Sequence, residues 1–257
     1  MLESKRIIVT GSASGMGEAT LNAFVKSGAN VIGMDVSDTN GKSICEKANN
    51  SGPGKCTYIH VDVSEKSSVQ DSFSQALNIM GGLDVLAHPA AIQRSSDASN
   101  VKVEDWDLMF AINVRGTMLT NQEAFRYMKE SGGGSIINFG SISGLRPEPS
   151  ASAYSSAKGA VHSWTRTAAG TWGKHNIRVN AILPAIATPM YYAARERSTE
   201  EENLASHWRN SIPISLGQEY GDPEKDLAPV MIFFASEASK FITGQLIPVD
   251  GGQTAGL

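Results

Sequence analysis

Short apolar runs, rich in β-branched residues, alternate along this chain with longer segments that suit helices. The runs are apolar on both faces, which is typical of strands covered by helices on both sides of a parallel sheet. Strands are expected at residues 6–9, 30–34, 57–61, 85–87, 135–139, 178–182 and 245–248. Helical segments between them include residues 17–27, 69–79, 105–130 and 153–173. The alternation predicts right-handed βαβ units in a single α/β domain, with a Rossmann-type, doubly wound parallel β-sheet flanked by helices on both faces.

Composition narrows the classes of protein to which the chain can belong. A length of 257 residues suits one such domain with a sizeable core, and no repeat or Pro/Ser-rich linker divides it. The net charge of −4 predicts neither nucleic acid nor a membrane surface as a partner. The first residues lack signal-peptide features, and no apolar run approaches the roughly 18 residues of a membrane helix. Cys45 and Cys56 have neither CxxC nor metal-type spacing, so we interpret them as reduced thiols and expect a cytoplasmic location.

A glycine-rich turn follows the first expected strand and precedes the first helix. It reads Thr10-Gly11-Ser12-Ala13-Ser14-Gly15-Met16-Gly17. Glycines let the backbone approach a pyrophosphate closely, and the start of a helix adds unpaired N–H groups and a favourable dipole. We therefore predict that Gly11, Ser14, Gly15, Met16 and Gly17 bind the phosphates of a dinucleotide. The alternative is a turn that binds nothing, but its place as the first βα turn favours the binding site.

Carboxylates follow the next two strands. Asp35 ends the second strand, 18 residues after Gly17, where it can accept hydrogen bonds from an adenosine ribose and repel a 2′-phosphate. No Arg or Lys follows it directly, so NAD is favoured over NADP as the cofactor. The alternative for Asp35 is a capping or turn aspartate. Asp62-Val63, at the end of the third strand, could place a carboxylate near the adenine amino group, although such a pair alone is weak evidence.

Ser141, Tyr154 and Lys158 form the constellation that carries chemistry. Tyr154 and Lys158 are four residues apart and share one face of a helix, and Ser141 lies 13 residues before Tyr154, just beyond a strand. Moving a hydride to or from a carbonyl carbon requires a proton to move on the oxygen. Tyrosine needs its pKa lowered by roughly three units to do this at neutral pH, and a neighbouring ammonium can contribute. A bare YxxxK is usually an ordinary helical surface pair, but the glycine loop and the serine make this match more specific.

These motifs together resemble one family over essentially the whole chain. The chain is similar to the short-chain dehydrogenases/reductases, specifically to their NAD-preferring branch with chains of this length. The matching stretches are the TGxxxGxG loop at residues 10–17, Asp35, Asp62-Val63, Ile112-Asn113-Val114, Ser141, Tyr154 with Lys158, Arg178-Val179-Asn180-Ala181, Pro184 with Thr188, and Thr243-Gly244-Gln245. The resemblance implies an NAD-dependent oxidoreductase that interconverts a secondary alcohol and a ketone.

The resemblance also implies a catalytic role for four residues. Tyr154 would be the general acid/base, Lys158 would lower its pKa, and Ser141 would orient the substrate oxygen. Asn113 would hold a water that links Lys158 to solvent and so completes a proton relay. The further residues implied in cofactor binding are Tyr154, Lys158, Pro184, Ile186, Thr188 and, through its backbone, Ala90. Ile186 and Thr188 would contact the carboxamide end of the nicotinamide.

Two stretches depart from the family pattern. The family usually reads Asn-Asn-Ala-Gly where this chain has His88-Pro89-Ala90-Ala91, and Pro89 supplies no N–H for a hydrogen bond there. His88 is either an additional acid/base or substrate contact, or a histidine that satisfies local backbone groups. The family commonly has Pro-Gly where this chain has Pro184-Ala185, so that an extra methyl narrows the space beside the nicotinamide.

The substrate is expected to meet three segments. Gln93 and Arg94 follow the fourth strand, and residues 143–148, beginning with Ser143, follow Ser141. Residues 188–221 form an expected lid that carries Met190, Tyr191, Tyr192 and Trp208. The aromatic side chains, Tyr191 among them, favour a small-molecule alcohol or ketone with an apolar or ring portion. Alternatively, Arg94 or Arg146 pairs with a substrate carboxylate, or both are solvated loop charges.

The resemblance further implies a homotetramer, packed through the helices at 105–130 and 153–173 and through the C-terminal strand. Trp164 and Trp172 belong either to such a surface or to the core. We expect His162 and His175 at the surface or in a subunit contact, and no His/Asp/Glu cluster has metal-ligand spacing.

Two other functions compete with the alcohol dehydrogenase. One is a catalytically silent NAD-binding sensor or subunit, but degenerate relatives would lose Tyr154 or Lys158, and both are present together with Asn113 and Ser141. The other keeps the cofactor and uses transient oxidation within an epimerisation or dehydration. Net formation of NADH on turnover would separate that chemistry from a simple dehydrogenase.

Overall fold

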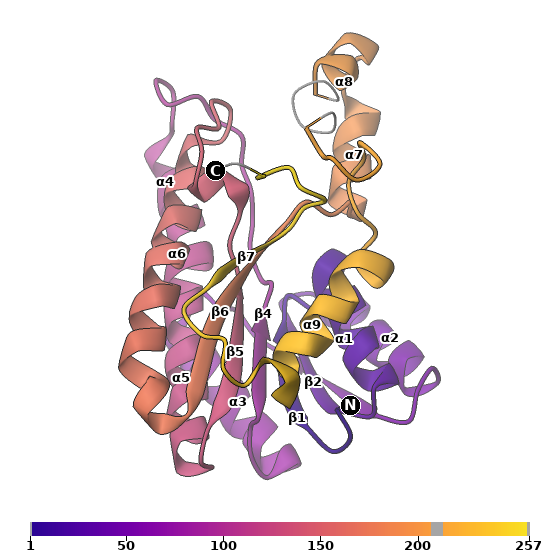
Figure 1. Cartoon of the computed structure of the whole chain (residues 1–257), viewed down its shortest axis with the longest axis vertical. Helices are drawn as coiled ribbons and strands as arrows, with labels where there is room; N and C mark the ends of the chain where they lie inside the picture. Colours follow the sequence, from indigo (N-terminus) through magenta and orange to yellow (C-terminus); the bar gives the residue numbers. More distant parts are fainter. Residues whose placement is uncertain (1, 207–212, 256–257) are drawn as a thin grey trace.

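The structure is a computed structural model that describes residues 2–206 and 213–255. Within these residues, seven parallel strands form one sheet in the order β3-β2-β1-β4-β5-β6-β7 (Figure 1). The strands are β1 Arg6–Thr10, β2 Asn30–Asp35, β3 Lys55–His60, β4 Val85–His88, β5 Gly134–Phe139, β6 Ile177–Pro184 and β7 Leu246–Val249. Every expected strand is present, with ends that differ by one or two residues. The expected doubly wound parallel sheet is therefore confirmed.

Helices connect the strands and form the two outer layers of the single domain (Figure 1). They are α1 Gly15–Lys26, α2 Asp38–Asn49, α3 Lys66–Met80, α4 Val103–Met109, α5 Gly116–Glu130, α6 Ser152–Trp172, α7 Pro189–Arg197, α8 Glu200–Ser206 and α9 Ala228–Ala235, with shorter π or 3-10 turns at η1 Phe110–Arg115, η2 Ile142–Gly144, η3 Gly173–His175, η5 Pro223–Leu227 and η6 Glu237–Ser239. None of these helices has both the length and the apolar character needed to cross a membrane.

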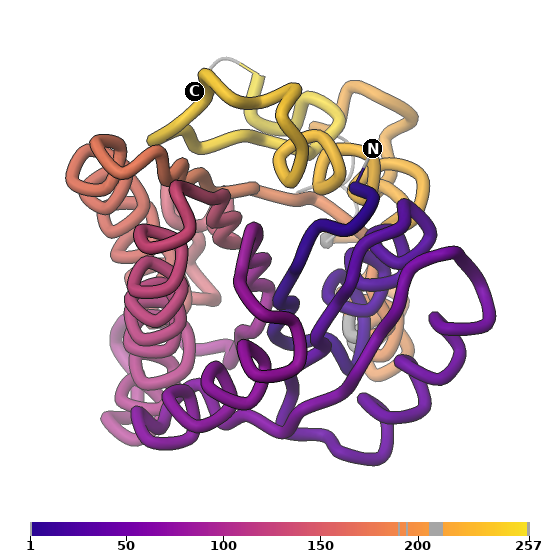
Figure 2. Tube along the Cα trace, turned by 90° about the horizontal axis from the view of Figure 1, so that it is seen from below, coloured from indigo at the N-terminus to yellow at the C-terminus, as the bar shows by residue number. Residues whose placement is uncertain are grey.

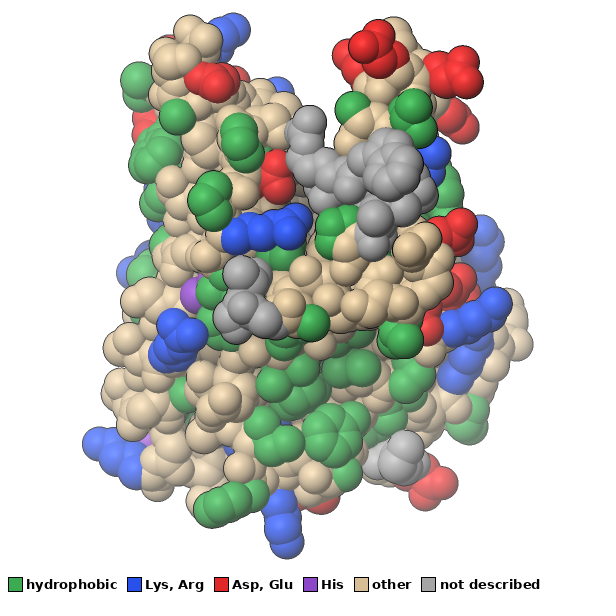
Figure 3. Space-filling view, turned by 45° about the horizontal axis from the view of Figure 1, so that its top comes forward, with side chains coloured by type: hydrophobic (Ala, Val, Ile, Leu, Met, Phe, Trp, Pro, Cys, Tyr) green, Lys and Arg blue, Asp and Glu red, His purple; other side chains and the backbone are tan. Residues whose placement is uncertain are grey.

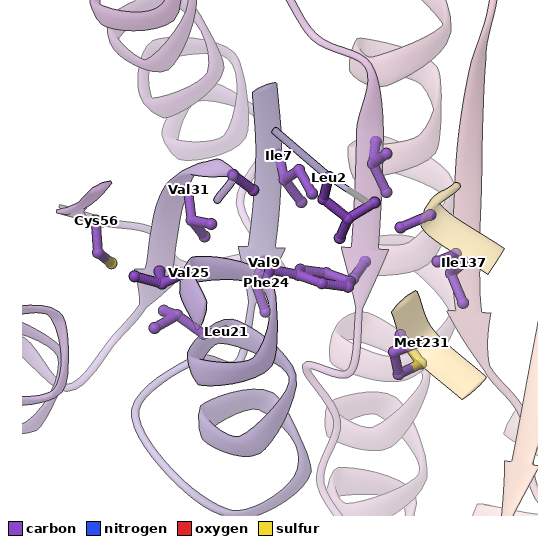
Figure 4. Close-up of a cluster of buried hydrophobic side chains, with 14 of the residues drawn as sticks. Leu2, Ile7, Val9, Leu21, Phe24, Val25, Val31, Cys56, Ile137 and Met231 are labelled. Carbon is purple, nitrogen blue, oxygen red and sulfur yellow. The ribbon is translucent and has the colours of Figure 1, made fainter. Parts of the chain in front are cut away.

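Alternate side chains of the strands enter two cores, one on each face of the sheet. Val9 of β1 packs in a cluster with Phe24 of α1, Ile137 of β5 and Met231 of α9 (Figure 4). The neighbouring Ile8 belongs to the other cluster, with side chains of α3, α5 and α6. A strand exposes successive side chains to opposite faces, which explains why both faces of the central strands are apolar. Both cores lie against the sheet and hold its ends in register.

Segments from the two ends of the chain lie side by side, as the view from below shows (Figure 2). Lys5, just before β1, forms an ion pair with Glu237 of η6 at 2.9 Å between Nζ and Oε1. Ser135 at the start of β5 donates a hydrogen bond from its hydroxyl to the carbonyl of Phe234 in α9, at 2.8 Å. These contacts attach α9 to the sheet at the end opposite the carboxyl ends of the strands.

The helix expected at residues 105–130 is divided into three parts. α4 and α5 are separated by η1, a stretch of π-helix from Phe110 to Arg115. A π turn widens the helix by one residue and releases backbone carbonyls from their usual partners, and such turns are frequent at functional sites. Asn113 lies in this stretch, so the departure from regular helix coincides with one of the expected site residues.

The segment expected to form a lid contains α7 and α8, which project away from the sheet (Figure 1). In the space-filling view this projection and the loops beside α4 stand on either side of a notch (Figure 3). Trp208 lies outside the described residues, and so does the side chain of Met190. The order in which the strands follow one another reverses between β1 and β4. At such a position, open α/β sheets bind ligands beyond the carboxyl ends of their strands.

Candidate active site

The turn between β1 and α1 is shaped so that only glycine fits at two of its positions. Gly11 has a φ of +60°, and a Cβ there would lie 2.7 Å from the Cα of Ala90. A Cβ on Gly17 would lie 1.9 Å from the carbonyl oxygen of Gly11. Ser14, at the N-cap of α1, makes no capping hydrogen bond with its side chain. The start of α1 therefore keeps free N–H groups beside a turn without side-chain bulk, which fits a pyrophosphate.

A cavity of about 140 Å³ lies beside this turn. The residues that line it are Gly11, Asp35, Val36, Val61, Asp62, Val63, Ala90, Ala91, Ile92 and Ile112. The carboxylate of Asp35 accepts hydrogen bonds from the backbone N–H of Ala13 at 3.0 Å and of Ser37 at 2.9 Å. Asp62 accepts from both the N–H and the hydroxyl of Ser64. The structure thus brings together the two carboxylates, Val63 and Ala90, in a space that suits an adenosine.

The segment after β6 also lies near the glycine turn. Ile186 pairs with Gly221 in a parallel bridge, and the Ala187 N–H donates to the Gly221 carbonyl at 2.9 Å. Thr188 lies next to the glycine turn, because a Cβ on Gly15 would be 3.7 Å from its side chain. The Thr188 hydroxyl also accepts from the N–H of Tyr191, in the first turn of α7. Pro184, Ile186 and Thr188 therefore extend the line of residues that begins at the cavity.

Tyr154 and Lys158 lie on α6, facing the end of β5. The Lys158 ammonium donates a hydrogen bond to the carbonyl of Phe139 at 2.7 Å, and it lies 5.6 Å from the centre of the Tyr154 ring. The Ser141 hydroxyl acts on the Tyr154 phenol and lowers its pKa. The same hydroxyl oxygen accepts the N–H of Ser143 at 3.1 Å. The three residues of the expected constellation therefore meet at the carboxyl end of β5.

Burial dominates the charge states of this group. It raises the pKa of Tyr154, and the hydrogen bond from Ser141 opposes that rise. Burial lowers the pKa of Lys158 to about 8, so its ammonium is still protonated at neutral pH. The expected lowering of the Tyr154 pKa is thus not a property of the protein alone. A further positive charge beside the phenol is needed to favour the phenolate.

Asn113 contributes to the site through its fixed position in η1. Its side chain is 1% exposed and binds both backbone groups of Ile92, accepting from the N–H at 2.9 Å and donating to the carbonyl at 2.8 Å. These bonds tie η1 to the turn after β4. The side chain thus uses one amide N–H and one side of its oxygen on Ile92, and the water of the implied proton relay stays a prediction.

The comparisons with known proteins agree with this arrangement. A family model described as enoyl-(acyl carrier protein) reductase matches residues 11–254. The chain is 34% identical over 252 residues to the 3-oxoacyl-(acyl-carrier-protein) reductase FabG of Thermotoga maritima, covering 98% of each. It is 36% identical over 258 residues to a 2,5-dichloro-2,5-cyclohexadiene-1,4-diol dehydrogenase of Sphingobium indicum, covering 99% of this chain and 98% of the relative. The solved structure of a short-chain type dehydrogenase/reductase from Mycobacterium ulcerans has a TM-score of 0.91 at 28% identity and covers 98% of this chain and 90% of that one.

The chain belongs to the short-chain dehydrogenase/reductase family. The expected family and reaction class are confirmed: the protein is an oxidoreductase that interconverts an alcohol and a ketone with a nicotinamide dinucleotide. None of these relatives favours a silent NAD-binding sensor.

His88, which departs from the family pattern, is a buried structural residue. It is 2% exposed, and its Nδ1 hydrogen-bonds the hydroxyls of Thr10 at 2.7 Å and Thr120 at 3.2 Å. Burial, helped by the charge of Lys158, lowers its pKa to about 3, so the ring is neutral. These contacts favour the alternative of a histidine that satisfies local polar groups, here the hydroxyls of β1 and α5.

The expectation that His162 lies at the surface or in a subunit contact is wrong. Its side chain is 3% exposed, and its Nε2 accepts the backbone N–H of Ser141 at 3.2 Å. His175 is half-buried and packs edge-on against Phe125. Trp172 lies in the core at 8% exposure, whereas Trp164 is partly buried and donates to Asn121.

The expected substrate residues are divided between two places. Ser143 lies beside Ser141 and Tyr154, at the carboxyl end of β5. Gln93 and Arg94 are exposed on the loop after β4, and Arg94 forms an ion pair with Asp105 of α4 at 3.3 Å.

Tyr191 of α7 packs against a residue that sequence reasoning did not select, Tyr220, with 4.8 Å between ring centres. The Tyr220 phenol hydrogen-bonds the side chain of Gln253, from the turn after β7. The charges of Arg146 and Glu148 both act on Tyr220, so the loop after Ser141 lies near it. The position of Tyr220 within the expected lid could have indicated a residue of the site. Nothing in the sequence predicts its proximity to Gln253.

Proposed function

We propose that the protein is an NAD-dependent dehydrogenase or ketone reductase for secondary alcohols, in which Tyr154 transfers the proton. The observation that carries this proposal is the meeting of Ser141, Tyr154 and Lys158 at the end of β5. The ammonium is held there by the carbonyl of Phe139. No other described part of the chain combines a phenol, a buried ammonium and a hydroxyl in this way.

The chain's own residues would each perform one part of the proton transfer. The Ser141 hydroxyl would donate to the substrate oxygen and hold the reacting carbon in place. Tyr154 would take the hydroxyl proton of the alcohol, or return it to the ketone. Lys158 would stabilise the phenolate and pass the proton on towards the backbone at Asn113. A bound nicotinamide dinucleotide supplies the hydride acceptor or donor, and in its oxidised form also a positive charge.

The experiment that tests the proposal is the Tyr154→Phe variant, which keeps the ring and removes the acid/base. We expect a folded protein that still binds NAD, as measured by calorimetry. Its rate of NADH formation from the alcohol should fall by several orders of magnitude. Tyr192→Phe is the matched control, since Tyr192 is 57% exposed on α7. A Tyr154→Phe variant with near-normal rates would reject Tyr154 as the acid/base.

The proposed preference for NAD over NADP rests on Asp35. Its half-buried carboxylate lines the cavity beside the glycine turn, and none of the residues that line this cavity is a lysine or an arginine. Asp35→Ala should lower the ratio of the NADP dissociation constant to the NAD dissociation constant, because repulsion of a 2′-phosphate is lost. Asp38→Ala is the control, since that exposed carboxylate pairs with His60 on α2's outer side. An unchanged preference in Asp35→Ala would exclude Asp35 as the ribose ligand.

The proposed substrate is a secondary alcohol on a carbocyclic ring. Tyr191 and Tyr220 offer aromatic faces, and the Sphingobium relative is named for a cyclohexadiene diol. Of the two candidate arginines, Arg94 is paired with Asp105, whereas Arg146 has no ion pair with any described residue. Arg146 is thus the better candidate for a substrate carboxylate. A panel of cyclic alcohols with and without a carboxylate, followed by NADH formation, would identify the class.

We propose further that residues 188–221 act as a lid over this site and that the protein is a homotetramer in a reducing, cytoplasmic compartment. An apolar groove supports one subunit contact; its lining includes Phe110, Met118, Val161 and Trp164 of η1, α5 and α6. A second contact is supported by Phe241, which is 99% exposed just before β7. Cys45 and Cys56 are both free. Light scattering on the parent and on Met118→Glu would test the assembly, and hydrogen exchange of the lid with and without NAD would test closure.

A further inference from the structure

His162 continues the catalytic face of α6. It follows Lys158 by four residues, as Lys158 follows Tyr154, so the three side chains lie on one side of the helix. Its imidazole reaches the loop that carries Ser141, and its Nε2 accepts the Ser141 N–H at 3.2 Å. No role in the reaction follows from the proposed function for this histidine.

The loop is fitted around the imidazole by two glycines. A Cβ on Gly140 would lie 2.5 Å from Nε2 of His162, and a Cβ on Gly144 would lie 2.7 Å from its Cε1. These glycines directly bracket the turn from Ser141 to Ser143. Both spaces are too small for any side chain, so the loop rests on the ring at both of its ends.

The Ser141 N–H differs from its neighbours in its acceptor. The N–H of Gly140 bonds to the carbonyl of Ile182 and that of Gly144 to the carbonyl of Ser141, both within the backbone. Ser143 donates to the Ser141 hydroxyl. Only the N–H of Ser141 in this turn reaches a side chain from another element, and that side chain is His162.

The ring remains an acceptor at working pH. Burial lowers the pKa of His162 to about 4, with further lowering by the charges of Lys158 and Arg166, while the Gly144 backbone opposes the shift. The neutral ring that accepts at Nε2 carries its proton on Nδ1, which is buried without a partner among the described residues.

We propose that His162 is a positioning residue: by accepting the Ser141 N–H and filling the space between Gly140 and Gly144, it holds the Ser141 hydroxyl against Tyr154. This inference rests on the proposed function, since it assumes that Ser141 and Tyr154 act on the substrate oxygen. His162 itself touches neither substrate nor cofactor. Its contribution should therefore pass entirely through Ser141.

A double-mutant cycle tests this dependence. His162→Leu removes the acceptor and keeps an apolar side chain, and it is made both in the parent and in Ser141→Ala. In the parent we expect kcat to fall by about tenfold, the effect of a lost positioning hydrogen bond, with the KM for NAD unchanged. In Ser141→Ala the same change should alter kcat by less than about twofold. His162→Gln, which retains an acceptor, should restore part of the loss of kcat. His175→Leu is the control, at a histidine that packs against Phe125.

The pH profile gives an independent readout. Because the Ser141 hydroxyl lowers the pKa of Tyr154, His162→Leu should move the acidic limb of kcat/KM for alcohol oxidation, where Tyr154 must lose its proton, to higher pH, and Ser141→Ala should do the same. Equal losses of kcat in both backgrounds with an unmoved profile would make His162 a packing residue and overturn the inference. So would loss of folding in both His162→Leu and His162→Gln. If instead Tyr154→Phe and Ser141→Ala keep full rates, the proposed function fails, whatever the His162 variants do.

Discussion

The floor of the site and its rim are built in different ways. We call Asn113, Ser141, Tyr154, Lys158 and His162 the floor, and Arg94, Arg146, Tyr191, Tyr220 and Gln253 the rim. Asn113, Lys158 and His162 are each at most 3% exposed, and each is bonded to the backbone of another segment. Among the rim side chains, Tyr191 packs on Tyr220 and Arg94 pairs with Asp105, and all five come from loops, α7 or the C-terminal turn.

This difference separates two kinds of information. A buried group held by backbone bonds has one position, which suits proton transfer at a defined atom. Loop and lid side chains with solvent around them can change without disturbing the cores, so they are free to define the substrate. We therefore expect the floor to carry the reaction and the rim to determine the substrate.

The largest effect is expected on the floor, at Lys158. Lys158→Met keeps the length of the side chain and removes the charge that is held at the carbonyl of Phe139. We expect kcat to fall by roughly three orders of magnitude, because phenolate stabilisation and proton transfer are lost together. Lys174→Met, at an exposed position in η3 just after α6, is the control. A loss below about tenfold would mean that the floor is less specialised than its burial indicates.

The second prediction concerns acid stability. Burial lowers the pKa of His88 from its ordinary value of 6.5 to about 3 in the folded protein. Below pH 6.5 this histidine is therefore protonated in the unfolded chain but still neutral in the folded protein. Stability present above pH 6.5 is thus lost as pH falls towards the folded pKa. Between about pH 7 and about pH 4.5 this histidine should cost about 3 kcal/mol of unfolding free energy. Urea titrations at both pH values should show that His88→Asn shrinks the difference by about that amount.

His175→Asn provides the reference for that measurement, since His175 is half-buried and packs edge-on against Phe125. It should leave the difference between the two pH values as in the parent. An equal change in both variants would show that the acid sensitivity does not come from the buried floor and its surroundings.

The sheet and the meeting of three of the expected site residues could be predicted because their signals are local. Tyr154 and Lys158 are one helical turn apart, and Ser141 follows directly after a strand, so pattern and spacing suffice. The glycine turn and Asp35 similarly belong to the first two strands. Only the π turn at η1 escaped prediction in this part of the chain, because a single widened turn leaves the apolar period of a helix nearly unchanged.

The contacts of His162 and Tyr220 could not be predicted for the opposite reason. His162 meets Ser141 only because the loop from Gly140 to Gly144 folds back onto α6. Tyr220 meets Gln253 across the space between the lid and the C-terminal turn. Such contacts join residues that are far apart in the sequence. Neither His162 nor Tyr220 belongs to a sequence motif that would predict its partner.

On the rim, a moderate effect is expected at Tyr220. Tyr220→Phe removes the hydroxyl that bonds Gln253 and keeps the ring that packs on Tyr191. We expect the KM for the alcohol to rise by about fivefold with little change in kcat, since one rim hydrogen bond is lost and the floor is intact. Steady-state kinetics on the best substrate of the panel would measure both, with Tyr192→Phe as the exposed control. A fall in kcat with KM unchanged would place Tyr220 functionally with the floor.

The smallest effect is expected at the outer edge of the rim, at Arg94. Its side chain and that of Asp105 are 55% and 33% exposed, and exposed ion pairs of this kind contribute little because water screens them. Arg94→Gln should therefore change the free energy of unfolding by less than about 1 kcal/mol and the substrate KM by less than about twofold. The matched variant Arg146→Gln should raise KM by about tenfold for a carboxylate-bearing alcohol and leave a neutral one unaffected. If Arg94→Gln produced the larger and carboxylate-selective change, the anion would bind on the α4 side of the notch, and the boundary of the rim would have to be moved there.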